Sequence, residues 1–129
     1  MAKKKTQHFY ELSVYNEARS LYASLRSSTQ KMSREERYNF IIPVMNKIEG
    51  IMTTIAIATI ADNKYEVLKP AVRSICEIQV TMRNLFELHL LTNKGFSSIA
   101  EHTESLRRQL VGWSKKYNGQ GTGDSPESV

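Results

Sequence analysis

Between Leu68 and Leu85 the chain reads LKPAVRSICEIQVTMRNL, and the order of apolar residues in this stretch decides the fold. The apolar residues recur at alternating intervals of three and four: Leu68, Ala71, Ile75, Ile78, Met82 and Leu85. At about 100° per residue, this spacing places all of these side chains on one face of an α-helix. Such a helix buries that face against other helices, so the stretch predicts one member of a helical bundle.

Local signals mark the ends of this helix. Asn63, with Glu66 three residues later, is a capping pattern that predicts its start. Gly95, in the segment Thr92–Gly95, suits the left-handed conformation that closes a helix, so the helix is expected to end there. Pro70 lies either at an early kink or in the true first turn, and the sequence leaves both alternatives open.

Two further helices are expected before this one. The first runs from about Phe9 to Ser28. Its apolar face consists of Val14, Ala18, Leu21 and Leu25. The second opens with the capping box of Ser33 and Glu36, contains Pro43, which should bend it, and ends near Asp62. Its inward face is predicted to consist of Ile41, Met45, Ile48, Met52 and Ile55.

A fourth helix is expected from Ser98, which forms a capping box with Glu101. Its apolar face consists of Ile99, Thr103, Leu106, Leu110, Trp113 and Tyr117. Four amphipathic helices with short connections predict an all-α fold, an antiparallel up-down four-helix bundle over residues 9–118. Residues 1–8 are interpreted as a flexible basic arm, and residues 119–129, which contain three glycines, as a disordered tail.

Composition narrows the class of protein. The chain has 129 residues, enough for one domain, and its 18 Lys and Arg against 13 Asp and Glu give a net charge of +5. This excess favours polyanionic partners. No apolar run reaches the roughly 20 residues of a membrane helix, and no hydrophobic segment follows the basic start of the chain. We therefore expect a cytoplasmic protein with no membrane partner.

The residue patterns of catalytic and metal sites are missing from the sequence. The single cysteine, Cys76, cannot form an internal disulfide and is interpreted as a small buried side chain. No carboxylate stands three residues before His8, His89 or His102, so the Glu-x-x-His pattern of dimetal bundles is not present. We therefore expect a protein that is not an enzyme, with no catalytic residue, no metal and no cofactor.

The second predicted helix is apolar on more than one side. Residues 50–61 read GIMTTIAIATIA and contain no charge. Four of its residues point away from the predicted inward face: Ile42, Thr53, Ile57 and Ile60. A helix that is apolar around most of its girth is buried on two sides, so these residues predict an interface between copies of the chain. The alternative is a few solitary exposed isoleucines, which are ordinary.

Basic residues at helical spacing supply the functional signal, since Arg and Lys bind phosphates without reading bases. The predicted contacts to nucleic acid are Arg19, Arg26, Lys69, Arg73, Arg83, Arg107, Arg108 and Lys115. Tyr15 and Tyr22 share a stripe with the arginines of the first helix, and their rings either stack on bases or edge the core. The alternative for any of these cations is a solvated role, as in the i,i+4 pair of Glu104 and Arg108.

The order of segments and several motifs resemble a family of small bacterial four-helix-bundle proteins. The similar motifs are MSREERY at 32–38, SICEI at 74–78, RNLF at 83–86 and LRRQLVGW at 106–113. The family includes the accessory variability determinant (Avd) of diversity-generating retroelements and the proteins encoded by intervening sequences in bacterial 23S rRNA genes. The resemblance covers roughly residues 9–118. The sequence TIADN at 59–63 departs from the Asn-Ile-Ala-Glu-Gly-like sequence of the rRNA-associated branch, which favours Avd.

The resemblance to Avd implies a homopentameric, positively charged barrel with no catalytic activity. It also implies two partners besides further copies of the chain, namely a reverse transcriptase and nucleic acid, either RNA or DNA. The implied function is to support the mutagenic reverse transcription that diversifies a target gene. The resemblance to the other branch implies instead a protein-interaction or RNA-associated scaffold, and this alternative stays open.

Overall fold

The computed structural model describes residues 8–117, and all regular structure in this range is helical. In chain order the elements are η1 (Phe9–Glu11), α1 (Ser13–Ser28), α2 (Arg34–Glu36), η2 (Arg37–Ile41), α3 (Ile42–Ala58), α4 (Lys64–Glu87) and α5 (Asn93–Lys116). Because α2, η2 and α3 follow one another without a break, they form one rod. The predicted all-α class is confirmed, whereas the expected arm and tail lie, apart from His8, outside the described residues.

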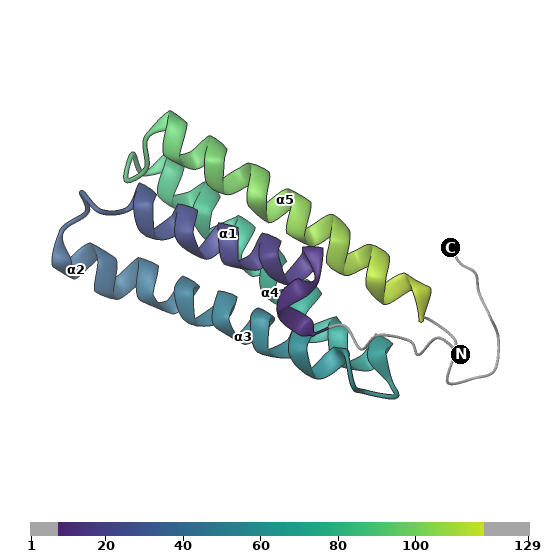
Figure 1. Cartoon of the computed structure of the whole chain (residues 1–129). Coiled ribbons are helices and arrows are strands. Elements are labelled where there is room, and N and C mark those ends of the chain that lie inside the picture. Colours follow the sequence, from purple (N-terminus) through teal and green to yellow (C-terminus); the bar gives the residue numbers. More distant parts are fainter. Residues whose placement is uncertain (1–7, 118–129) are drawn as a thin grey trace.

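The four rods lie side by side and run alternately in opposite directions (Figure 1). Helix α1 packs against α3 and α5, and α4 packs against the same two helices. The rods therefore stand at the corners of a square, with α1 across from α4 and α3 across from α5. This arrangement is the antiparallel up-down bundle that the short connections predict.

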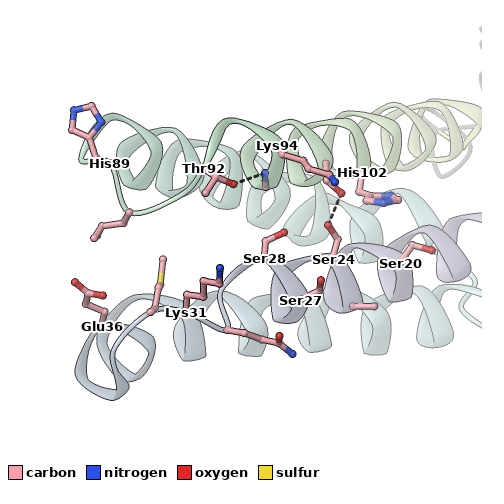
Figure 2. Close-up of a pocket in the computed structure, with 16 residues that line it drawn as sticks. Ser20, Ser24, Ser27, Ser28, Lys31, Glu36, His89, Thr92, Lys94 and His102 are labelled. Carbon is pink, nitrogen blue, oxygen red and sulfur yellow. Dashed lines mark hydrogen bonds between the residues drawn. The ribbon is translucent and has the colours of Figure 1, made fainter.

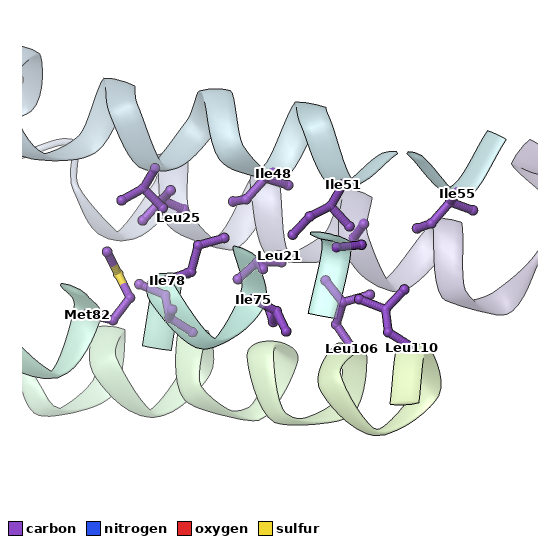
Figure 3. Close-up of a cluster of buried hydrophobic side chains, with 14 of the residues drawn as sticks. Leu21, Leu25, Ile48, Ile51, Ile55, Ile75, Ile78, Met82, Leu106 and Leu110 are labelled. Atoms are coloured by element: carbon purple, nitrogen blue, oxygen red, sulfur yellow. The ribbon is translucent and has the colours of Figure 1, made fainter. Parts of the chain in front are cut away.

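The centre of the bundle is filled by aliphatic side chains from all four rods (Figure 3). Every residue of the apolar face between Leu68 and Leu85 is buried, as are the four predicted on α1. Leu21, Ile48 and Leu106 are fully buried at the centre. Full burial of such a side chain contributes roughly 1.5–3 kcal/mol to stability, so this shared core holds the rods together.

The second rod differs from its prediction around Pro43. The capping box at its start is formed, with Glu36 N–H donating to Ser33 Oγ at 3.0 Å. Instead of a simple bend, a π-helical turn, η2, lies directly before Pro43. Proline lacks an N–H and its ring crowds the carbonyl four residues earlier, and a wider turn relieves that conflict. On the inward side, Val44 and Ile51 are buried where the two methionines were expected.

The displaced methionines, Met45 and Met52, are half-buried and pack against the edge of the core. Helical spacing allows either this pair or Val44 and Ile51 to face inward. The positions of α1 and α4 decide which of the two pairs points to the centre. Cys76 was also expected to be buried and is exposed. It follows Ile75 on α4 and is rotated by about 100° from the buried face.

The turn between α4 and α5 corrects two expectations. Helix α4 ends at Glu87, and the left-handed residue is His89, with φ 65°, rather than Gly95. Leu90 N–H donates to the carbonyl of Leu85 at 2.9 Å, and His89 N–H donates to that of Phe86 at 3.0 Å. This pair of bonds is a Schellman motif, which satisfies the free carbonyls at the end of α4 and reverses the chain.

Helix α5 therefore starts earlier than Ser98. Its N-cap is Thr92, whose side chain accepts a hydrogen bond from Gly95 N–H at 2.9 Å. The added first turn places Phe96 against Phe86 of α4, with ring centroids 4.3 Å apart. Gly95 thus serves the beginning of α5 and not the end of α4.

The expected cap at the start of α4 is not formed. The side chain of Asn63 makes no capping hydrogen bond. Lys64 Nζ instead donates to the carbonyls of Ala58 and Ala61, each at 2.8 Å, and so satisfies free carbonyls at the end of α3. Pro70 lies inside α4, because the helix already begins at Lys64.

Replacing Ile48 tests the core. Ile48→Ala should lower the free energy of unfolding by about 2–5 kcal/mol, because it removes buried methyl groups and leaves a cavity. Urea denaturation followed by circular dichroism measures this loss. Val80→Ala is the control, since Val80 is 61% exposed and its truncation should change stability by less than about 0.5 kcal/mol. Equal stability of the two variants would contradict the described core.

Candidate nucleic-acid interface

The charges of the chain are divided unequally between its two halves. Residues 64–116, which contain α4 and α5, carry nine Lys and Arg against five Asp and Glu. Residues 8–63, which contain the other two rods, carry six of each. The whole net positive charge of the described residues therefore lies on the α4–α5 hairpin.

Six of the eight predicted nucleic-acid contacts lie on this hairpin. Helix α4 carries Lys69, Arg73 and Arg83, and α5 carries Arg107, Arg108 and Lys115. We call these six residues the α4–α5 basic surface. The remaining two, Arg19 and Arg26, are exposed on α1, which lies across the bundle from α4. The structure therefore brings six of the predicted residues onto one pair of adjacent helices and separates the other two.

An open groove of about 720 Å³ lies between α4 and α5, at the end of the bundle where α4 begins. Three predicted cations, Lys69, Arg73 and Lys115, line it together with Pro70 and Val111. Lys115 has no carboxylate within 4.0 Å among residues 8–117. The groove thus combines cationic side chains with apolar ones, and its one acidic lining residue, Glu66, lies 3.6 Å from Lys69.

Most of the other cations on this surface are paired with a glutamate on their own helix. Arg73 lies 3.4 Å from Glu77, and Arg83 lies 2.8 Å from Glu87. Lys69 lies 3.6 Å from Glu66. Exposed pairs of this kind contribute only about 0–1 kcal/mol, so a phosphate can replace the carboxylate at little cost.

Glu104 is the centre of a small polar network between α4 and α5. Arg107 Nη2 lies 2.6 Å and Arg108 Nη1 lies 3.6 Å from Glu104 Oε2, and Gln79 of α4 donates to Oε1 at 3.3 Å. The hydrogen bonds from Arg107 outweigh the desolvation of the carboxyl group and lower the pKa of Glu104 to about 2, helped by Gln79. The same contact raises the pKa of Arg107. The single negative charge of Glu104 thus lies against two of the predicted nucleic-acid contacts, Arg107 and Arg108.

The tyrosines of α1 edge the core, as one of the two interpretations had it. Tyr22 is half-buried, and its hydroxyl donates to Glu49 of α3 at 2.8 Å, which raises the pKa of Tyr22. Tyr15 is also half-buried, with its ring centroid 5.1 Å from that of Phe9 in an edge-to-face contact. Both rings are already engaged within the bundle.

The outward side of α3 carries the residues predicted to join copies of the chain. Ile42 is 42% exposed, Ile57 is 49% exposed and Ile60 is 84% exposed, and Thr53 is exposed between them. Ile60 lies in the turn that follows α3. No other element in the range 8–117 covers these side chains, so the second apolar side of this rod faces outward.

A hollow of about 880 Å³ lies between α1 and the beginning of α5 (Figure 2). Hydroxyl groups dominate its lining, and Ser24 Oγ lies 2.8 Å from Ser98 Oγ across it. His102 Nδ1 is bound to Glu17 Oε2 at 2.7 Å, and no hydrogen bond in the described residues joins His102 to a serine. No group of three or more His, Cys, Asp or Glu within residues 8–117 could hold a metal ion.

Sequence spacing missed one cationic feature of the structure. Arg34 lies before the π turn and Arg37 is its first residue, and both line a small hollow with Tyr38, which is 73% exposed. The three residues were noted only as part of a motif shared with a family. The available signal was two basic residues at helical spacing next to an aromatic residue.

No protein-family model, no curated protein and no solved structure matches the chain. The family resemblance therefore rests on the sequence motifs alone.

One rod, Arg34–Ala58, is long and apolar enough by length and composition to cross a membrane, with a mean hydropathy of 1.4 over its most apolar window. This finding is weak support for a membrane protein, because the core helix of a water-soluble bundle passes the same test.

The pKa of Glu104 provides a test of the α4–α5 network. Arg107→Ala should raise this pKa from about 2 towards its ordinary value of 4.5. Because the pKa is lower in the folded state, ionised Glu104 stabilises the fold above about pH 4.5, and this contribution is lost as the pH falls towards 2. Carboxyl NMR titration measures the shift. Arg83→Ala, which removes a partner of Glu87 instead, is the control and should leave the pKa of Glu104 unchanged.

Proposed function

We propose that the chain is a non-catalytic accessory protein whose copies assemble and bind nucleic acid through the α4–α5 basic surface. The observation that carries this proposal is that, within residues 8–117, the whole net positive charge lies in residues 64–116. Phosphate contacts of this kind position RNA or DNA without reading its sequence. Arg19 and Arg26 stay predicted contacts on a separate side of the bundle.

Self-association is the second part of the proposal. The uncharged stretch 50–61 offers Ile57 and Ile60 for burial against another copy, and Ile42 is the predicted contact at the other end of α3. Helix α3 stands across the bundle from α5, so an interface on α3 leaves the cations of α5 accessible. Charges from several copies would then add up, which strengthens a surface that is weak in one subunit. A closed pentamer is the assembly that the resemblance to Avd implies.

The partner enzyme is the third part. The motifs shared with Avd support a reverse transcriptase of a diversity-generating retroelement, with mutagenic reverse transcription as the process that the chain assists. A reverse-transcriptase gene and a pair of near-identical repeats beside the gene for this chain would support it further.

One observation favours a second candidate function. Five of the eight predicted contacts form ion pairs with a glutamate of the same helix, as is common on a merely solvated helix face. A protein-interaction or RNA-associated scaffold of the rRNA intervening-sequence type, whose charge serves solubility, is therefore the alternative. It differs from the first proposal in binding no nucleic acid through this surface.

Neutralising the groove between α4 and α5 tests the nucleic-acid proposal. The variant Lys69→Gln, Arg73→Gln, Lys115→Gln should bind two RNAs of unrelated sequence equally weakly, and its log–log salt slope should fall by about 3. Fluorescence polarisation over a range of salt concentrations measures both quantities. The control, Ser20→Glu, Ala23→Glu, Ser27→Glu, changes the net charge by the same amount at exposed positions of α1.

If both variants lose the same affinity, binding depends on overall charge and the groove has no special role. If the unaltered protein binds no RNA or DNA at moderate salt, the proposal fails and the scaffold alternative stands.

Charged substitutions on α3 test self-association. Ile57→Glu, Ile60→Glu should reduce the particle to a single subunit of 14.8 kDa, because a carboxylate in an apolar interface is costly to desolvate. Light scattering coupled to gel filtration gives the mass. Val80→Glu adds a carboxylate at an exposed apolar position of α4 and should stay assembled. A single subunit already present in the unaltered protein would refute the interface.

A further inference from the structure

The π turn presents an aromatic ring to solvent. Tyr38 is 73% exposed, more than any other aromatic side chain in residues 8–117. Neither an aromatic ring nor a cation lies against its ring in that range. Tyr10, the next most exposed aromatic residue at 53%, stacks on His8 instead. A single exposed ring is ordinary by itself, so its surroundings decide what it can do.

Two arginines line the same small hollow as this ring. Arg34 and Arg37 form no ion pair with any acidic group of residues 8–117, unlike most of the arginines on α4 and α5. The nearby carboxylate of Glu36 is engaged in the capping box, where it accepts from Ser33 N–H at 3.2 Å. The cations beside Tyr38 are therefore available to an external anion.

The wider turn brings these side chains together with Ile42. In an α-helix, residue 42 would be rotated by about 140° from residue 37. In the π turn the Ile42 N–H donates to the carbonyl of Arg37, five residues earlier. The side chains of these two residues therefore lie closer to the same side of the helix than they would in an α-helix. The result is a hollow of about 330 Å³ lined by Arg34, Arg37, Tyr38 and Ile42.

We propose that this hollow binds single-stranded nucleic acid, with one base stacked on Tyr38 and the neighbouring phosphates held by Arg34 and Arg37. The inference rests on the proposed function and names the form of nucleic acid. An aromatic ring can stack on a base only when that base is unpaired and free of its own neighbours. The two arginines of the same hollow supply the charge that the neighbouring phosphates require. An acidic peptide would use the arginines but has no need of the ring.

Substitution of Tyr38 separates stacking from charge. Tyr38→Ala should weaken binding of a fluorescent single-stranded RNA of about 12 nucleotides by about tenfold, because a stacked base is lost. Binding of a duplex RNA of the same length should not change. Tyr38→Phe should bind like the unaltered protein, since it keeps the ring. Tyr10→Ala, which removes an exposed tyrosine with no flanking arginine, is the matched control and should leave both affinities unchanged.

The outcomes distinguish this inference from the proposed function. Equal losses for single strand and duplex, or no loss in Tyr38→Ala, would overturn the stacking site while leaving the basic surface in place. Binding of a glutamate-rich peptide that Tyr38→Ala weakens, with RNA binding unaffected, would overturn it in favour of a protein partner. If the unaltered protein binds neither form of RNA nor DNA, the proposed function itself fails.

Discussion

Within residues 8–117, nineteen apolar side chains from the four rods and Leu91 from the turn between α4 and α5 form one buried cluster, and their removal from water fixes how the rods pack. Within residues 8–117 the buried polar side chains are few, with Thr29, Thr103 and Ser114 among them. Thr29 and Thr103 satisfy their hydroxyls on carbonyls of their own chain segment. The core can therefore pack without a metal or a disulfide, and each rod buries one face in it.

Because the core uses only one face of each rod, the outward faces are free to differ in chemistry. Within residues 8–117 the α4–α5 hairpin carries the net positive charge, the outer side of α3 carries exposed isoleucines, and the π turn carries the exposed Tyr38. The square arrangement keeps α3 and α5 on opposite corners. The exposed Ile57 and Ile60 therefore lie away from the cations of α5, whereas Ile42 belongs both to the outer side of α3 and to the hollow that Tyr38 lines.

The fold was predictable where burial follows a simple period. The predicted apolar faces of α1 and α4 match the buried residues of these helices one by one. The spacing of apolar residues indicates directly which side of a helix becomes buried. The end of α4 was not predictable from Gly95, because His89 adopts the left-handed conformation and the Schellman bonds reverse the chain earlier. Histidine is tolerated there at a cost that glycine would not incur, and sequence rules favour the cheaper residue.

For the candidate site, the sequence by itself determined the residue types: an excess of Arg and Lys on the last two helices and an uncharged stretch in the second. Composition and helical spacing are properties of the chain itself and do not depend on which helices pack against one another. Only the tertiary structure decided which of these residues meet. It placed Lys69 and Lys115 in one groove, joined Tyr22 to Glu49 of α3, and placed Arg37 and Ile42 around one hollow at the π turn. Those relations depend on which rods become neighbours and on how Pro43 is accommodated, and both are settled when the rods pack together.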